Sequence, residues 1–241
     1  MKNLLQSLYV SKILSPQQTH DSCGNPKGLL RLAAQTIEPS GSGHIGDGTG
    51  STIDHETESL IQFATLTGCM MDPDKVDVLF KQKQIKGGSE HLVALLPGEE
   101  RVLKDLNVRL KATESTFDYL TDLALSNYFF DDDIRLEGLY VEDGVLHIVT
   151  SQPFISGIHP DWDLLKSGML ERGFKHENPN SRIPTFCAWV AGLGEVSIID
   201  LHENNVVLGK VSQAVEPIDA HFYFDSVFER IAALRHLRLL D

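Results

Sequence analysis

Two short apolar runs near the end of the chain constrain its fold more than any other feature. Residues Asn205–Leu208 and Val215–Ile218 are separated by a polar turn at Gly209–Gln213. Two such runs joined by a turn that contains Gly are typical of a β-hairpin. Because a hairpin reverses the chain, we expect it to carry Asp219 back beside Asp200, which precedes the first run.

Asp200, Asn205 and Asp219 have the types and the order that phosphoryl transfer to a hydroxyl group requires. One Asp accepts the hydroxyl proton, an Asn five residues later holds Mg²⁺, and a second Asp bridges the metal and the phosphates. Asp200 is thus a candidate base, and Asn205 and Asp219 are candidate metal ligands. The alternative is that all three lie in ordinary loops. The segment Asp200–Asn205 resembles the catalytic loop of the aminoglycoside phosphotransferase branch of the kinase-like superfamily.

A second group of candidates lies in a predicted hairpin upstream. Val93–Leu96 and Arg101–Leu103 are predicted strands joined by a Pro97-Gly98 turn. Backbone N–H groups of a Gly-rich turn can approach phosphates, and a Lys on the following strand can pair with them. An exposed Lys at a strand end is the alternative, but the order Gly, Lys, Asp, Asn, Asp along the chain favours nucleotide binding. The candidates are Gly87, Gly88, Ser89, Val93 and Lys104.

Residues 114–127 have one apolar helical face, so we expect a helix that orients Lys104 through an acidic side chain. Glu114 is the first choice. Asp118 and Asp122 remain alternatives, because a Glu at the start of a helix also interacts favourably with the helix dipole.

The segment LEGLYVEDGVLHIVTSQPFISG predicts two strands, Ile134–Tyr140 and Val145–Thr150, around a Glu142-Asp143-Gly144 turn. With GGSEHLV upstream and PID downstream, it resembles the serine/threonine/tyrosine kinase domain found in polyvalent proteins of phages and mobile elements. The likeness spans about residues 84–224.

The resemblance implies an α+β, protein-kinase-like two-lobed fold that binds ATP and Mg²⁺. We expect an N-terminal helical extension at 1–83, an N-lobe at 84–150, a hinge at 151–158 and a reduced helical C-lobe at 159–241. Backbone groups of the hinge would contact adenine, which makes Gln152 and Phe154 candidate cofactor-binding residues. In the C-lobe, Asp161–Arg172 is a predicted helix ended by Gly173.

The extension contains a Gly-rich tract with the pattern G-x-G-x-x-G at Gly41, Gly43 and Gly46. Pro39 precedes it where a buried strand should run, and no Lys follows nearby. We therefore interpret residues 40–51 as a flexible linker and not as a phosphate loop. An amphipathic helix over Asp54–Leu66 follows, with Leu60, Ile61, Phe63, Ala64 and Leu66 inward. Asp72-Pro73, an N-cap followed by Pro at the first helical position, predicts a further helix to about Gln82.

Charge and cysteine content exclude several classes of function. The 34 acidic and 21 basic residues give a net charge of -13, so we expect no direct binding to nucleic acid or to an anionic membrane. The three cysteines form no C-x-x-C pair, and the N-terminal segment is too polar for a signal peptide. These features predict a cytoplasmic protein.

The acceptor of the phosphoryl group is not identified by these motifs. It is either a protein Ser, Thr or Tyr or a small molecule. Asp219 is followed by Ala220-His221, with no recognisable activation segment. Two alternatives therefore stay open: a pseudokinase or nucleotide-sensing module that transfers nothing, and a structural interaction domain that binds no nucleotide.

Overall fold

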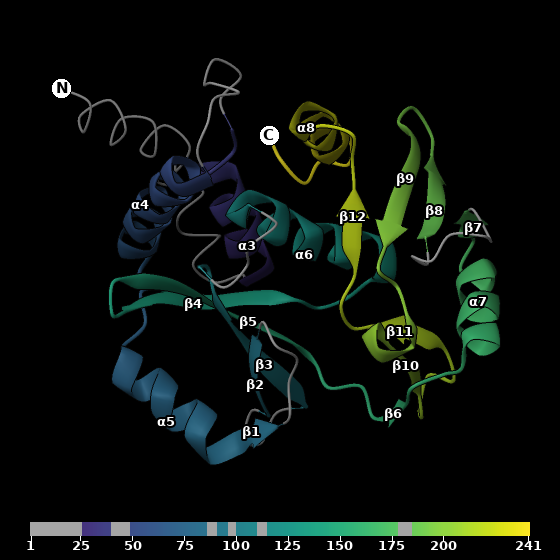
Figure 1. The fold of residues 1–241 in the computed structure, drawn as a ribbon, viewed down its shortest axis with the longest axis horizontal. Coiled ribbons are helices and arrows are strands. Elements are labelled where there is room, and N and C mark those ends of the chain that lie inside the picture. The colour runs from purple at the N-terminus through teal and green to yellow at the C-terminus, as the bar shows by residue number, and fades with distance from the viewer. Residues whose placement is uncertain (1–25, 40–48, 86–90, 96–99, 110–114, 178–184) are drawn as a thin grey trace. The chain divides into compact units, whose positions relative to one another are not determined.

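The computed structural model describes residues 26–39, 49–85, 91–95, 100–109, 115–177 and 185–241 (Figure 1). These residues contain six α-helices and three antiparallel sheets, which confirms the predicted α+β class. None of the described helices is long and apolar enough to cross a membrane. The chain divides into two compact units, residues 1–124 with 133–153 and residues 125–132 with 154–241.

The first unit is built on a five-stranded antiparallel sheet with the order β1-β2-β3-β5-β4. The tight turn between β4 and β5 confirms the predicted hairpin, since Asp143 and Gly144 both have positive φ, of 50° and 75°. Consecutive positive φ values match the right-handed twist of the paired strands. The strands are β1 (Gln84–Ile85), β2 (His91–Leu95), β3 (Arg101–Asn107), β4 (Arg135–Glu142) and β5 (Val145–Pro153).

Helices cover both faces of this sheet. In Figure 1, α5 lies on the opposite side of the β4–β5 pair from α3 and α4. Helix α5 begins as predicted, with Pro73 at its first position and the Asp72 carboxylate accepting a hydrogen bond from Asp74 N at 3.1 Å. The helices are α3 (Pro26–Thr36), α4 (Thr49–Thr67), α5 (Pro73–Lys83) and the first part of α6 (Thr116–Phe130). The core beneath α5 comprises Val76, Phe80, Ala94, Leu103, Tyr140 and Val149.

The buried stripe of α4 differs from the predicted one. Leu66 was expected inward but is 62% exposed, so that expectation is wrong. The buried residues recur at helical spacing and include polar side chains, which leaves Leu66 off the stripe. They are Glu56, Ser59, Leu60, Phe63, Ala64 and Thr67.

The helices before residue 84 do not form a separate extension. Both α3 and α4 pack against β4, and α5 packs against β2 and β4, so all three contribute to the core of the first unit. The structure also differs from the predicted linker at 40–51, because α4 already begins at Thr49. A Gly in the first helical turn, such as Gly50, has little effect on a helix whose apolar residues are buried further along. Residues 40–48 and the N-terminal residues 1–25 lie outside the described ranges.

The outer edge of β4 is covered by the segment between α4 and α5. Met71 N donates to Leu139 O at 2.7 Å, and Leu139 N donates to Cys69 O at 3.0 Å. A Cβ atom on Gly138 would lie 2.5 Å from the Cys69 carbonyl oxygen. The close approach therefore requires glycine, and it protects an edge strand that would otherwise expose unpaired backbone groups.

We expect Gly138→Ala to destabilise the protein by about 1–3 kcal/mol, because the added methyl group would force the Cys69–Met71 segment off β4. Thermal unfolding measures the effect as a lower melting temperature. Glu142→Ala, at an exposed site on the same strand, is the control and should melt like the wild type. Equal melting temperatures for all three proteins would contradict the assigned packing.

The second unit contains two further antiparallel sheets, with orders β12-β9-β8-β7 and β11-β10-β6. It has more strand than the predicted helical C-lobe. Its aromatic core joins the end of α6 to the sheet, since Phe129 stacks on Phe222 and Phe130 stacks on Phe174. The strands are β6 (Gly157–Ile158), β7 (Lys175–Glu177), β8 (Thr185–Val190), β9 (Gly194–Ile199), β10 (Val206–Gly209), β11 (Val215–Pro217) and β12 (His221–Tyr223).

Two helices complete the second unit, α7 (Trp162–Glu171) and α8 (Val227–His236). The predicted limits of α7 are confirmed. Its N-cap Asp161 accepts a hydrogen bond from Leu164 N at 2.9 Å, and Gly173, with φ of 88°, ends the helix. Only local signals were needed for both assignments.

Candidate functional site

A closed loop follows β9 and holds Asp200 and Asn205 together. Asp200 is the first residue after the strand and has φ of 57°, a left-handed conformation that turns the chain sharply. The side chain of Asn205 donates from Nδ2 to the backbone carbonyl of Asp200 at 2.9 Å. His202 N donates to the same carbonyl at 3.1 Å. The Asp200 carboxylate and the Asn205 Oδ1 atom take no part in these bonds, and both are oxygen ligands that the loop can present.

Asp219 returns to the same end of the sheet, as the hairpin predicted. β10 and β11 pair antiparallel, and Ile218 N donates to Asn205 O at 2.9 Å. β12 then pairs with β9, with His221 opposite Ile199. Asp200 lies one residue beyond this pair and Asp219 two residues before it, so both acidic residues lie at the same end of the β9–β12 ladder.

His202 forms the turn that carries Asn205. Its Nδ1 atom accepts a hydrogen bond from Asn204 N at 3.2 Å, which caps the 3₁₀ turn Glu203–Asn205. Its Nε2 atom lies 3.8 Å from Asp200 Oδ1. His202 is therefore a scaffold residue of the loop, as is common for a His that hydrogen-bonds the backbone.

In the first unit, Val93, Lys104 and Gln152 share one face of the sheet. Lys104 pairs with Val93 on β2 and with Thr150 on β5, and directly opposed residues point to the same side. Gln152 is two residues further along β5, so it points to that side as well. Leu103, in the core beneath α5, points to the other side. Lys104 and Val93 are half-buried, and Gln152 is buried.

Helix α6 lies on the same side of the sheet as Lys104. Tyr119 Oη is 3.5 Å from Thr150 Oγ1, and Thr150 is the cross-strand neighbour of Lys104. Of the two alternative acidic residues on α6, Asp118 bonds locally, since its carboxylate accepts from Ser115 Oγ at 2.9 Å. Asp122 is one turn along from Tyr119 and only 3% exposed. Glu114, the first choice, lies outside the described residues.

The predicted phosphate loop lies outside the described residues, and the predicted nucleotide-binding residues do not all belong to one unit. Gly87, Gly88 and Ser89 lie outside the described ranges. Phe154 follows β5, is half exposed, and belongs to the second unit, whereas Gln152 belongs to the first. The roles predicted for all of these residues stay predictions.

Sequence reasoning missed two polar groups of the first unit. On the α5 side of the sheet, Tyr140 Oη donates to Asp105 Oδ2 at 2.7 Å, and His147 Nδ1 lies 3.1 Å from Asp105 Oδ1. On α4, the buried Glu56 carboxylate accepts a hydrogen bond from Thr116 N at 3.0 Å. The only sequence signal for Glu56 is its place on the apolar stripe of α4.

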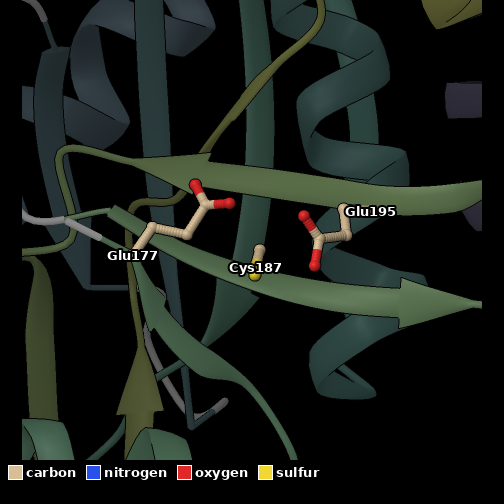
Figure 2. A group of neighbouring side chains, drawn as sticks. All are labelled: Glu177, Cys187 and Glu195. Carbon is tan, nitrogen blue, oxygen red and sulfur yellow. The ribbon is translucent and has the colours of Figure 1, made fainter.

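Glu177, Cys187 and Glu195 converge on one face of the four-stranded sheet in the second unit, with their ligand atoms within 4.8 Å of one another (Figure 2). Burial, with the two nearby carboxylates, raises the pKa of the Cys187 thiol to about 11. Cys187 is therefore a neutral thiol near pH 7, and its reactivity as a nucleophile is low.

The family comparison confirms the predicted resemblance. A model of the family described as Serine/Threonine/Tyrosine Kinase found in polyvalent proteins matches residues 54–226. No curated protein and no solved structure matches the chain. The matched range begins at residue 54, whereas the motifs placed the likeness at 84–224, so most of α4 and all of α5 fall within the matched domain.

Proposed function

We propose, on the premise that this chain belongs to the family of serine/threonine/tyrosine kinases found in polyvalent proteins, that it transfers a phosphoryl group from ATP to a hydroxyl acceptor. The observation that carries this proposal is the loop in which the Asn205 side chain is bonded to the Asp200 backbone, with Asp219 at the same end of the β9–β12 ladder. In this proposal, one hydrogen-bonded turn would supply the base and one metal ligand, and a short hairpin would supply the other ligand.

The donor atoms suit Mg²⁺. Asp219 offers carboxylate oxygens and Asn205 offers an amide oxygen, and hard oxygen ligands are those that Mg²⁺ prefers. When bound, Mg²⁺ would neutralise negative charge on the phosphates of ATP. The Asp200 carboxylate would orient the acceptor hydroxyl and accept its proton as the oxygen attacks.

The first unit supplies the groups proposed to hold the nucleotide. Lys104 would pair with the phosphates, and Val93 and Gln152 are on the same face of the sheet. We assign Asp122 as the acidic partner that orients Lys104. This choice rests on its burial and on the contact of Tyr119, one turn before it, with the strand beside Lys104.

The alternative of a pseudokinase is supported by one observation. Strand β12 begins two residues after Asp219, and α8 follows soon after, so the described segment 219–227 contains no long loop on which a protein substrate could dock. A small hydroxyl compound as acceptor is compatible with this feature. A module that binds ATP without transfer is compatible with it as well.

Incubation with ATP labelled at the γ-phosphate and Mg²⁺ tests the proposal. We expect label on the protein itself, on a generic protein or on one of a set of small hydroxyl compounds. We also expect Mg-ATP to raise the melting temperature, because a ligand that binds only the folded state stabilises it. A higher melting temperature without transfer would support the pseudokinase, whereas no thermal shift and no binding in calorimetry would overturn both proposals.

A further inference from the structure

The start of α6 is held by a residue from a distant helix. The first backbone N–H groups of a helix have no partner within the helix. In α6 one of them, Asp118 N, bonds to the local cap Ser115 Oγ at 3.0 Å. Another, Thr116 N, donates at 3.0 Å to Glu56 on α4, sixty residues earlier. The second bond ties the first turn of α6 to α4 as well as to its own cap.

A glutamate at this buried position would destabilise the protein if it only filled space. The side chain is 3% exposed, and burial raises the pKa of its carboxyl group even though the hydrogen bonds from Thr116 partly oppose this effect. A buried carboxylate is costly unless it is bonded. At a helix N-terminus its charge also interacts with the positive end of the helix dipole. Glu56 is thus suited to fix the position of α6 and not merely to fill space.

Helix α6 carries Asp122, the acidic residue proposed above to orient Lys104. Tyr119 and Asp122 lie within its first two turns, and Tyr119 contacts the strand residue beside Lys104. A displacement of the first turn would therefore move Asp122 relative to Lys104.

We propose that Glu56 is a positioning residue for nucleotide phosphate binding: by holding the start of α6, it keeps Asp122 oriented toward Lys104. This inference rests on the proposed function. Through Glu56, α4 would contribute to the geometry of the nucleotide site, although α4 precedes every nucleotide-binding motif in the sequence.

The experiment compares Glu56→Ala, which removes the acceptor, with Glu56→Gln, which keeps an oxygen at the same place. Glu58→Ala, at an exposed site on the same helix, is the control for the substitution. Gly138→Ala is the control for general loss of stability, because it acts at the edge of β4. Amide hydrogen exchange across residues 116–122 and the kcat and KM for ATP are measured for each protein, below its melting transition.

We expect Glu56→Ala to increase hydrogen exchange at the start of α6 and to reduce kcat/KM for ATP by about ten- to a hundredfold, the scale expected for a misplaced binding group. In Glu56→Gln, the hydrogen exchange at the start of α6 and the kcat/KM for ATP should both stay within about threefold of the wild type, because the side-chain oxygen can still accept the bond from Thr116 N. Glu58→Ala and Gly138→Ala should leave kcat/KM unchanged.

Three outcomes would overturn the inference. The first is a wild-type kcat/KM in Glu56→Ala although hydrogen exchange at the start of α6 has increased. The second is an equal loss of kcat/KM in Glu56→Ala and Glu56→Gln. The third is an equal loss of kcat/KM in Glu56→Ala and Gly138→Ala. A wild-type protein that neither binds nor hydrolyses ATP would instead remove the proposed function. In that case hydrogen exchange alone still decides whether Glu56 anchors α6, and unchanged exchange in Glu56→Ala would reject the anchoring.

Discussion

Asp200→Asn is expected to slow phosphoryl transfer by about a hundred- to ten-thousand-fold, the range typical of a lost general base. The affinity for Mg-ATP should stay within about threefold of the wild type, because the proposed task of Asp200 concerns the acceptor hydroxyl in the transition state. Calorimetry measures the affinity, and label transfer at saturating ATP measures the rate.

The structure indicates that this substitution leaves the conformation of the loop unchanged. Asn tolerates the left-handed conformation that Asp200 adopts, with φ of 57°. The backbone carbonyl that accepts the Asn205 side chain is unchanged by the substitution. Asp163→Asn, at an exposed site in the same unit, is the matched control and should transfer label normally. If Asp200→Asn loses ATP binding, or transfers label at the wild-type rate, Asp200 is not the base.

Asp219→Asn should produce the opposite pattern, with a loss of Mg²⁺-dependent ATP binding of at least about tenfold. The substitution removes a negative charge that the proposed metal site needs, while the shape of the side chain is kept. Titration of ATP with Mg²⁺ and titration of ATP with a chelator separate the two contributions. In the chelator, the variant should bind ATP at least as well as the wild type, because one negative charge near the phosphates has been removed.

The pair of variants tests the division of labour between the two aspartates. Equal affinities of Asp219→Asn and the wild type for Mg-ATP would exclude Asp219 as a metal ligand. Loss of binding in Asp200→Asn with binding kept in Asp219→Asn would mean that the two roles are reversed. For a pseudokinase, Asp200→Asn would alter no activity, and only the Asp219 variant would have a measurable effect.

Local sequence determined a large part of the secondary structure of the described residues. The β4–β5 turn followed from Asp143-Gly144, because few residue pairs accept two positive φ values. The starts of α5 and α7 followed from Asp72-Pro73 and Asp161, whose side chains satisfy backbone N–H groups only a few residues away. The β10–β11 hairpin likewise needed only two apolar runs and a polar turn. Each of these features depends on interactions within a few residues, which a sequence pattern records directly.

The tertiary structure decided how these elements share cores and which polar residues become buried. The pairing of Lys104 with Val93 and Thr150, the pairing of β12 with β9, and the packing of α3 to α5 on the sheet all join distant parts of the chain. No sequence pattern marks Gly138, whose importance comes from the Cys69 carbonyl group that packs against it in the fold. Glu56 likewise carried no motif, since its role depends on an N–H group sixty residues away. Propensity and periodicity describe the surroundings of a residue along the chain, whereas desolvation and hydrogen bonding depend on its surroundings in space, and only the fold supplies those.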